Sequence, residues 1–378
     1  MKLSLLFTLL AWLTGSVAAS AQNASQPDTT SRPGLFTTDS VLAFTLKVPI
    51  QRLLKDRGDT TVPHAAQLSY AATAQETVTL PVKLKVRGHF RRQWNNCSFP
   101  PLYLDVPKKK AANTPFANQN KLKLVTHCEV EEYVVREYLV YRLYNLLTEH
   151  SFRARLCRVT YVDSAGKIPP ETRWAALLED EDDLRKRNGG KPNKLRDITM
   201  PNVDSLSMAT LGVFEYLIGN TDWSVPNRHN IRLLTVSTHV HPVPVPYDFD
   251  YSGIIEAFYA VPPDYLGIAS VRERFYRGPA YPETLFQRVF DRFNQLKPQF
   301  YALYRNDSRL DPAYVKRTLL YLDEFYADIS DPAIVRSIFL DGKRHKGAIK
   351  KPTAAPSAQK KSTSGAIAPT SKKPVVKK

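Results

Sequence analysis

The sequence predicts an α+β protein, because strand-like and helical patterns occupy different parts of the chain. Between residues 35 and 106, apolar and β-branched residues recur in short runs, at 41–46, 77–80 and 82–86. Two long helical patterns rich in Phe, Tyr and Leu follow towards the other end, at 282–304 and 312–326. Roughly 300 residues lie between the two terminal segments, enough for one large domain or two smaller ones with a proper core.

The middle of the chain alternates between the two kinds of element. Further strands are expected at 99–104, 121–124 and 153–162. A helix is expected over 131–147, where Val135, Leu139, Leu143 and Leu147 recur every four residues. Arg136, Glu137 and Arg142 should then point away from this apolar stripe. A second helix is expected over 206–218.

The segment from residue 219 to 250 carries the strongest chemical signal. It holds Asp222, then Asn227 and Asn230, and then Asp248 and Asp250. Alternating apolar residues at 231–236 and 243–247, with a turn-prone stretch between them, predict a β-hairpin. A hairpin would bring the polar groups at its two ends together.

These residue types suit transfer of a phosphoryl group from a nucleotide. Oxygen and amide ligands hold magnesium on the phosphates, and a carboxylate lies beside the attacking hydroxyl. The order Asp, Asn, hairpin, Asp is the one in which kinase-like sites supply these groups. Each short motif alone would favour an ordinary turn or helix cap, but together they favour the phosphotransfer site.

The chain resembles the CotH spore-coat kinase family of secreted, kinase-like proteins. The resemblance spans residues 82–253 and includes a strand ending in Arg87-Gly88, a lysine-bearing strand at 121–124, and the elements Gly-Asn-Thr-Asp-Trp, His-Asn and Asp-Phe-Asp. It implies a two-lobed atypical protein-kinase-like fold over 35–340, with a strand-rich N-lobe at about 35–190 and a helical C-lobe at about 191–340. It also implies ATP and magnesium, with Asp222 at the acceptor hydroxyl and Asn230, Asp248 and Asp250 at the metal. Asn227 competes with Asn230 for that role.

The cation that contacts phosphate is less well defined. The family has a Lys-Lys pair on the strand after its Arg-Gly segment, whereas residues 99–102 hold no lysine. No Gly-x-Gly-x-x-Gly loop is present either, and Arg91 and Arg92 follow the single Gly88. Guanidinium groups can bind phosphate oxygens bidentately in place of such a loop. The candidates for phosphate contact are Lys85, Arg87, Lys121 and Lys123, and on a strand Lys121 and Lys123 share one face.

A glutamate would be needed to orient a phosphate-binding lysine, by analogy with protein kinases. Glu179 and Glu181 are the candidates, at the end of the apolar stretch 174–178. An equally good interpretation is a structural helix at 179–187, because its acids lead, its bases trail and both complement the helix dipole. Asn188-Gly189-Gly190 should end that helix and open a loop.

The two ends of the chain indicate export and a charged appendage. Residues 1–21 have the lysine, apolar core and small-residue cleavage site of a secretory signal peptide, and residues 22–34 form a polar lead. The tail at 341–378 holds 11 Lys or Arg, one Asp and no aromatic residue, which predicts disorder. The whole chain carries a net charge of +17, most of it in this tail. The tail would attract anionic polymers or surfaces without specificity, so no specific nucleic-acid partner is expected.

Three cysteines, Cys97, Cys128 and Cys157, stand in this exported context. One disulfide with one remaining thiol is compatible with that number, but spacing does not reveal the pairing. Their spacing is also unlike that of a zinc site.

The sequence therefore predicts an exported kinase, periplasmic or extracellular, that transfers phosphate from ATP to a protein or cell-envelope acceptor. The first alternative is an inactive kinase-like scaffold or binding protein of the envelope. A metal-dependent hydrolase or a nucleotidyl transferase could use the same carboxylates, since a fold alone does not decide reaction class. Oligomeric state is not encoded in any motif.

Overall fold

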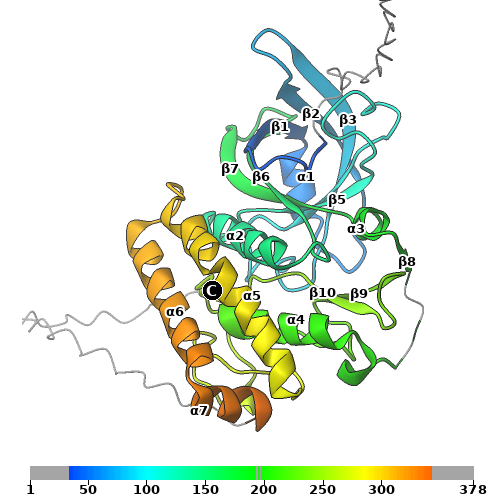
Figure 1. Ribbon diagram of the computed structural model, residues 1–378. Helices are drawn as coiled ribbons and strands as arrows, with labels where there is room; N and C mark the ends of the chain where they lie inside the picture. The colour runs from blue at the N-terminus through cyan, green and yellow to red at the C-terminus, as the bar shows by residue number, and fades with distance from the viewer. Residues whose placement is uncertain (1–33, 193–194, 196, 343–378) are drawn as a thin grey trace, which may run out of the picture.

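The computed structural model describes residues 34–192, 195 and 197–342. The predicted signal peptide, nearly all of the predicted lead and nearly all of the predicted tail lie outside these residues. The described chain has a mixed α+β fold, with most strands gathered at one end of the molecule and most helices at the other (Figure 1). None of the helices in the described ranges combines the length and apolar character needed to cross a membrane.

Seven strands form a closed barrel in the order β1-β2-β3-β4-β5-β7-β6. The strands are β1 (Leu42–Val48), β2 (His64–Ala71), β3 (Thr77–Val86), β4 (Leu102–Asp105), β5 (Lys121–Val125), β6 (Ala154–Asp163) and β7 (Glu171–Leu178), with the short helix α1 (Ile50–Lys55) after β1. Neighbouring strands are antiparallel except β1 and β6, which pair in parallel with Leu42 opposite Cys157. The predicted strands are confirmed, and their closure into a barrel is an addition to what the sequence indicated.

Alternation along β5 decides which side chains leave the barrel. Leu122 and Leu124 are fully buried in its interior, whereas Lys121 and Lys123 project from the outer face. The expectation that the two lysines share a face is therefore confirmed. On the neighbouring strands, Lys85 lies opposite Tyr103, and Tyr103 lies opposite Lys123. Lys85, Tyr103 and Lys123 thus form one row across three strands.

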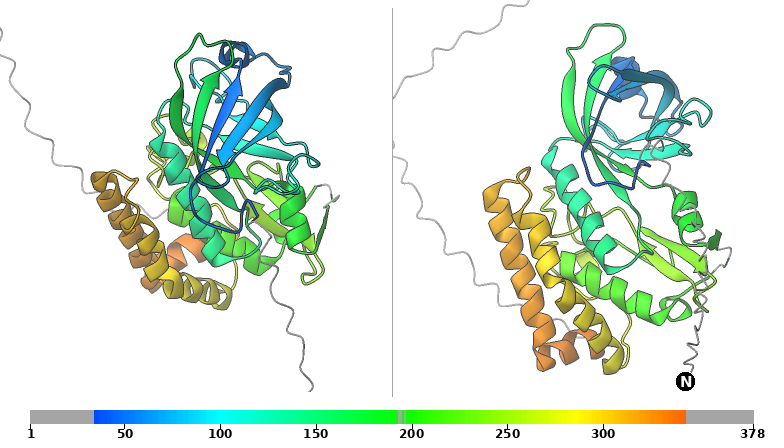
Figure 2. Two further views of the ribbon diagram at one scale, coloured as in Figure 1. Left: turned by 90° about the horizontal axis from the view of Figure 1, so that it is seen from above. Right: turned by 45° about the horizontal axis from the view of Figure 1, so that its top comes forward.

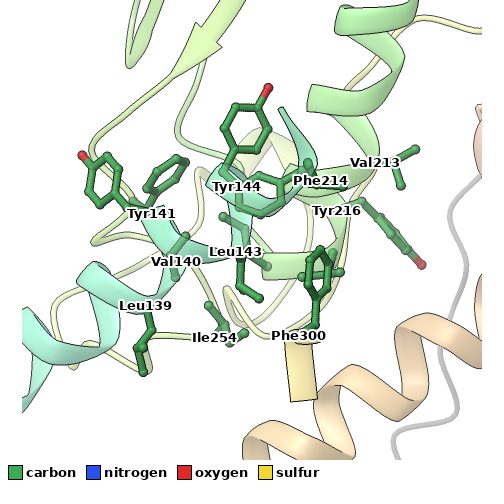
Figure 3. Close-up of a cluster of buried hydrophobic side chains, with 14 of the residues drawn as sticks. Leu139, Val140, Tyr141, Leu143, Tyr144, Val213, Phe214, Tyr216, Ile254 and Phe300 are labelled. Atoms are coloured by element: carbon green, nitrogen blue, oxygen red, sulfur yellow. The ribbon is translucent and has the colours of Figure 1, made fainter. Parts of the chain in front are cut away.

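The long predicted helices are all present. They are α2 (Glu132–Leu147), α4 (Ser205–Ile218), α5 (Glu283–Arg305) and α6 (Pro312–Ser330), with shorter helices α3 (Glu181–Arg187) and α7 (Pro332–Val335) and helical turns at Met200–Asn202, Asp264–Leu266 and Arg336–Leu340. Helices α5 and α6 lie side by side along one flank of the molecule (Figure 2). Aromatic side chains from α2 and α4 meet in the core between them (Figure 3), where the rings of Tyr144 and Phe214 are 4.7 Å apart.

Helix α2 corrects one expectation of the sequence analysis. Arg136 and Glu137 were expected to point away from the apolar stripe, yet they are only 7% and 3% exposed. The reason is that α2 is covered on several sides, because it packs against β6, β7 and α5. A helix enclosed in this way has no solvent-facing side for its charged residues.

Three clusters of buried side chains stabilise the described part of the structure: one inside the barrel, one among the helices, and a smaller one that includes Met208 and Leu211 of α4. The helical cluster also includes Leu156 and Leu178 of the barrel strands β6 and β7. Because this core crosses from strands to helices, the arrangement does not by itself establish two lobes. The boundary near residue 190 stays a prediction.

A second, three-stranded sheet contains β8 (Gly190–Pro192), β9 (Ile231–Val236) and β10 (Val243–Pro246) in the order β10-β9-β8. The predicted hairpin is confirmed, with Pro246 opposite Ile231 at its open end. The predicted loop after α3 is instead strand β8 from Gly190 onward. Gly190 allows this close pairing, because a Cβ atom there would lie 2.8 Å from Leu234 Cδ1.

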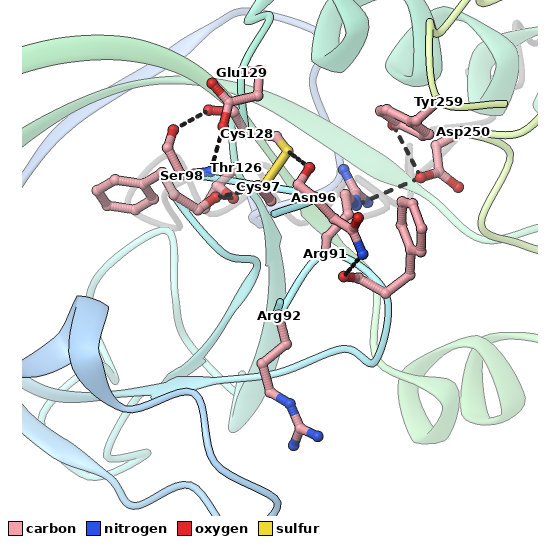
Figure 4. Close-up of a disulfide and its surroundings, with 12 residues drawn as sticks. Arg91, Arg92, Asn96, Cys97, Ser98, Thr126, Cys128, Glu129, Asp250 and Tyr259 are labelled. Carbon is pink, nitrogen blue, oxygen red and sulfur yellow. Dashed lines mark hydrogen bonds and ion pairs between the residues drawn. A yellow bond between two sulfur atoms is a disulfide. The ribbon is translucent and has the colours of Figure 1, made fainter. Parts of the chain in front are cut away.

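The cysteines form one disulfide, between Cys97 and Cys128 (Figure 4), and Cys157 is a buried free thiol inside the barrel. One disulfide with one thiol left over agrees with the sequence analysis. The disulfide ties the β3–β4 connection to the segment that follows β5.

Candidate active site

The β9–β10 hairpin brings the polar groups at its two ends together. The backbone N–H of Tyr247 donates a hydrogen bond to the carbonyl oxygen of Asn230, at 3.0 Å. Asp248 therefore follows directly after a residue bonded to Asn230. Asn227, by contrast, is exposed in the turn before the hairpin. Of the two candidate asparagines, Asn230 is the one that the structure places beside the carboxylates.

Asp222 is held by His229 and Asn230, the two residues that precede β9. Its Oδ2 accepts a hydrogen bond from Asn230 Nδ2 at 3.0 Å, and its Oδ1 lies 2.8 Å from His229 Nε2. Its backbone N–H donates to Asn220 Oδ1 at 2.9 Å, just after α4 ends at Gly219. A carboxylate has about four acceptor positions, so Asp222 keeps lone pairs for a further hydroxyl donor.

Two of the predicted metal ligands adopt left-handed backbone conformations. Asn230 has φ of 52° and Asp248 has φ of 65°. Asn and Asp tolerate this region better than other non-glycine residues, yet such conformations persist only where the surroundings enforce them. For Asp248, the backbone N–H donates to the hydroxyl oxygen of Tyr141 on α2, at 2.9 Å. Helix α2 thus anchors the backbone at Asp248.

Asp250 lies deeper, in a cluster of buried charges (Figure 4). Its Oδ2 lies 3.5 Å from Arg91 Nε and accepts a hydrogen bond from the Tyr259 hydroxyl at 3.1 Å. Burial raises the pKa of Asp250, and Arg91 opposes this effect while Asp248 and Asp222 add to it. The charges of Arg91, Asp248 and Asp250 also act on Glu137 of α2, and burial likewise raises the pKa of Glu137. Arg91 thus pairs with Asp250, and the charges of Glu137 and Asp248 also act on it.

Lys123 is the predicted lysine that faces this cluster. Burial lowers its pKa to about 8, the Arg87 charge acts in the same direction, and Asp248 opposes both. The Lys123 ammonium lies 4.6 Å from the centre of the Tyr247 ring, and the Arg232 guanidinium lies at the same distance from that ring. Lys123 on the barrel thus lies over the residue that immediately precedes Asp248 at the end of the second sheet.

The other predicted cations take different places. Lys121 lies over the Tyr103 ring, 4.0 Å from its centre, and is exposed. Lys85 is half-buried in the same row as Lys123. Arg87 acts electrostatically on Lys123 and Glu137, and its Nε is buried with no hydrogen-bond partner among the described residues.

The Glu179 carboxylate is engaged by residues other than Lys123. Its carboxylate accepts hydrogen bonds from Arg187 at 2.9 and 3.0 Å and from the backbone N–H of Arg153 at 3.0 Å. These bonds fasten α3 to the start of β6, which is a structural task. Glu181, the alternative, forms an ion pair with Arg232 at 2.7 Å and acts electrostatically on Lys123.

Glu137, Tyr141 and Tyr259 were not identified as site residues from the sequence, and Arg91 was noted there only as a possible phosphate contact, not as the partner of Asp250. One signal for Glu137 was available: it lies in a helix whose other positions are mainly apolar or aromatic, and a charge in such a helix is buried with partners. No comparable signal marked Tyr141 or Tyr259, whose hydroxyl groups reach the site from separate elements.

The donor types fit a magnesium ion, although they are not pre-assembled around one. Asn230, Asp248 and Asp250 offer amide and carboxylate oxygens, which magnesium prefers. Glu137 Oε1 is buried without a hydrogen-bond partner among the described residues, in a cluster rich in carboxylates. Within the described ranges, no three His, Cys, Asp or Glu side chains already stand in metal-binding geometry.

Comparisons with known proteins add little to this picture. No protein-family model matches the chain, and no curated protein matches it. Among solved structures, the chain is similar to a Helicobacter pylori proinflammatory kinase, CtkA. The sequences are 11% identical, the TM-score is 0.34, and the match covers 71% of this chain and 96% of that chain. A likeness this weak does not establish a shared fold.

Proposed function

We propose that this protein is an exported atypical kinase that transfers phosphate from ATP to a hydroxyl group of a protein or cell-envelope polymer. The observation that carries the proposal is the position of Lys123, on the barrel, over the ring of Tyr247, because the next residue, Asp248, is held beside Asn230 by the β9–β10 hairpin. A cation for phosphate and two oxygen ligands for magnesium then face each other across the two sheets.

Each residue has a role that follows from its contacts. Lys123 and Arg87 bind phosphate oxygens, while Asn230 and Asp248 ligate magnesium with Asp250 in support. When bound, ATP supplies the electrophilic phosphorus and magnesium offsets the negative charge of the phosphates. Asn230 and His229 orient Asp222, which accepts the proton of the acceptor hydroxyl. As that proton leaves, the hydroxyl oxygen of the acceptor forms a bond to phosphorus, and the bond between phosphorus and the departing ADP breaks.

The architecture supports this assignment in outline. In the proposed kinase-like arrangement, the barrel is the N-lobe, the helical region is the C-lobe and the site lies where Lys123 meets Asp248. Glu137 of α2, rather than Glu179, is the glutamate near the phosphate-binding cations. It is buried, and the charges of Arg91 and Arg87 act on it.

One observation favours the alternative of an inactive kinase-like scaffold or envelope binding protein. Arg91 already pairs with Asp250, and both oxygens of Asp222 are already engaged by His229 and Asn230. A site whose charges are satisfied in this way is stable without nucleotide. The scaffold hypothesis predicts no turnover, with or without nucleotide affinity.

The deciding experiment uses the chain from Gln22 onward, the predicted mature start, with magnesium and either γ-labelled or α-labelled ATP. Three variants accompany it: Asp248→Asn, Asp222→Asn and, as a matched control far from the site, Asp291→Asn on the exposed face of α5. We expect γ label on the protein or on an added acceptor, lost in the first two variants and retained in the third.

The other outcomes separate the alternatives. Label from the α position would show nucleotide transfer instead of phosphate transfer. Hydrolysis of ATP to free phosphate, with no labelled acceptor, would show a hydrolase. Absence of label and of nucleotide binding by calorimetry would refute the kinase and support the scaffold.

A further inference from the structure

A residue far along the chain holds the backbone on both sides of Asp222. Arg277 lies between the helical turn Asp264–Leu266 and the start of α5. Its Nη1 donates a hydrogen bond to the carbonyl oxygen of Trp223 at 2.8 Å and another to the carbonyl oxygen of Thr221. Thr221 and Trp223 are the sequence neighbours of Asp222. One guanidinium nitrogen therefore binds the main chain on both sides of the proposed base.

The peptide groups of Asp222 itself are also bound by side chains. Its carbonyl oxygen accepts a hydrogen bond from Asn230 Nδ2 at 2.8 Å, and its N–H donates to Asn220 Oδ1 at 2.9 Å. Three consecutive carbonyl groups, at 221–223, thus have side-chain donors, and this stretch belongs to no helix or strand. Because no backbone ladder fixes the stretch, its conformation depends on these side chains.

Burial makes these hydrogen bonds important for the conformation of the stretch. Thr221 and Trp223 are each 3% exposed, whereas the Asp222 side chain between them is 37% exposed. The centre of the Trp223 ring lies 5.6 Å from the guanidinium carbon of Arg277. A buried carbonyl group that loses its donor destabilises the conformation that buries it. An acceptor can therefore reach Asp222 while Arg277 keeps the two neighbours of Asp222 in place.

The segment that carries Arg277 packs closely against α4. A Cβ atom on Gly212 of α4 would lie 3.1 Å from Tyr276 Cε2 and 3.4 Å from Gly278 Cα, so glycine permits this approach. The Tyr276 ring also contacts Phe339, with 4.8 Å between ring centres. The residues on either side of Arg277 are thus fixed by packing, and the guanidinium extends from a fixed base.

Arg274 of the same segment offers a matched comparison. It donates to the carbonyl oxygens of Leu217 in α4, at 3.3 Å, and of Tyr321 in α6, and it pairs with Glu324 at 3.2 Å. These contacts fasten the segment to two helices rather than to the stretch around Asp222. Removal of the Arg274 guanidinium should therefore disturb the segment without releasing Asp222.

We propose that Arg277 is a positioning residue for Asp222. By binding the two flanking carbonyl groups, it keeps the Asp222 carboxylate directed at the acceptor hydroxyl, and it acts through Asp222 rather than on the substrate. The catalytic part of this inference rests on the proposed function, whereas the geometric part does not. Without the guanidinium, the stretch at 221–223 loses two hydrogen bonds, and the bonds from Asn230 to Asp222 weaken with it.

The first measurement tests the geometry and needs no kinase activity. Three variants of the chain from Gln22 onward are compared with the native chain: Arg277→Met, Arg277→Lys and the control Arg274→Met. NMR gives the rate at which the Nδ2 protons of Asn230 exchange with water, and Asn230→Asp serves only to assign the resonance. We expect exchange about tenfold faster in Arg277→Met, the equivalent of one hydrogen bond, and the native rate in Arg274→Met.

The second measurement tests catalysis, as transfer of γ label from ATP to the protein itself and to casein as an added acceptor. We expect a kcat about 100-fold lower in Arg277→Met, the order of effect that misplacement of a catalytic group produces. Arg277→Lys should restore part of the rate, because its ammonium can still donate to a carbonyl oxygen, and Arg274→Met should keep the native rate. The Kd for ATP with magnesium, measured by calorimetry, should be the same in all, because Asp222 contacts the acceptor rather than the nucleotide.

The native exchange rate at Asn230 in Arg277→Met would overturn the proposal. Equal changes in Arg277→Met and Arg274→Met would also overturn it, because they would show a general loosening of the segment. Urea unfolding identifies a variant that has lost its fold, and if Arg277→Met does not fold, Arg277→Lys carries the same comparison. Absence of label with the native chain would refute the proposed function alone, and the exchange rate at Asn230 would still decide whether Arg277 positions Asp222.

Discussion

Glu215 of α4 offers a sharp test of how burial controls stability in this protein. It is 1% exposed, and neither of its carboxyl oxygens accepts a hydrogen bond from the described residues at normal distance. Burial raises its pKa from 4.5 to about 8, while the nearby Asn220 amide acts in the opposite direction. That amide is also without a hydrogen-bond partner among the described residues, so burial dominates.

The raised pKa has a definite consequence for stability. The folded state holds the Glu215 proton up to a higher pH than the unfolded state does, so the free energy of unfolding falls as pH rises from about 4.5 to about 8. Each unit of pKa corresponds to 1.36 kcal/mol, so the shift amounts to roughly 4–5 kcal/mol across that window. Glutamine has nearly the same shape and no charge, and Glu215→Gln should remove this contribution.

The assay is urea unfolding of the native chain and the variant at several pH values between 4 and 9. We expect nearly equal stability near pH 4 and a variant that is more stable by several kcal/mol at pH 8 to 9. Taking the difference cancels the other titrating groups that both proteins share. Glu283→Gln, at the exposed first turn of α5, is the matched control and should show no such trend. A difference between Glu215→Gln and the native chain that does not change with pH would refute the reasoning.

Three further predictions follow from other contacts. Replacing Cys97 and Cys128 together by serine removes a disulfide that spans 31 residues and should lower the free energy of unfolding by about 3–4 kcal/mol; equal midpoints of urea unfolding for the variant and the oxidised chain would contradict this. Arg57→Met should lower the free energy of unfolding by about 2–4 kcal/mol, because this guanidinium donates to the carbonyl oxygens of Leu54, Arg92, Cys97 and Ser98. The control Arg52→Met, on the exposed face of α1, should leave that free energy unchanged. Limited proteolysis should cleave the segment after residue 87 faster in Arg57→Met than in Arg52→Met, and equal rates would contradict the prediction. Asp248→Asn should lower the pKa of Lys123 below about 8, since the Asp248 charge raises it. NMR titration of the ¹³C-methylated lysine measures this shift. An unchanged or higher pKa would show that the two groups are not neighbours.

Local patterns predicted much of the site. The alternation at 231–236 and 243–247 was sufficient for the hairpin, because a strand's two faces follow from a period of two residues. The same rule placed Lys121 and Lys123 on one face. Asp222 and Asn230 could be paired because both lie next to the hairpin start, only eight residues apart.

Contacts between distant segments could not be predicted in this way. Arg91 meets Asp250 from a loop far earlier in the chain, and Glu137 reaches the same cluster from α2. Neither position carries a pattern that names its partner. Glu179 illustrates the reverse case, since its place after an apolar strand suggested a ligand, yet Arg187 and the Arg153 backbone occupy it.

By itself, the sequence determined the α+β class, the helices and strands that follow from periodicity, and the chemical types available for a site. Only the tertiary structure decided that β1 closes the barrel against β6, that Cys97 pairs with Cys128, and that Lys123 rather than Lys121 lies over the Tyr247 ring next to Asp248. The physical reason is range. Secondary structure depends on neighbours within a few residues, whereas burial and charge depend on which distant segments pack together.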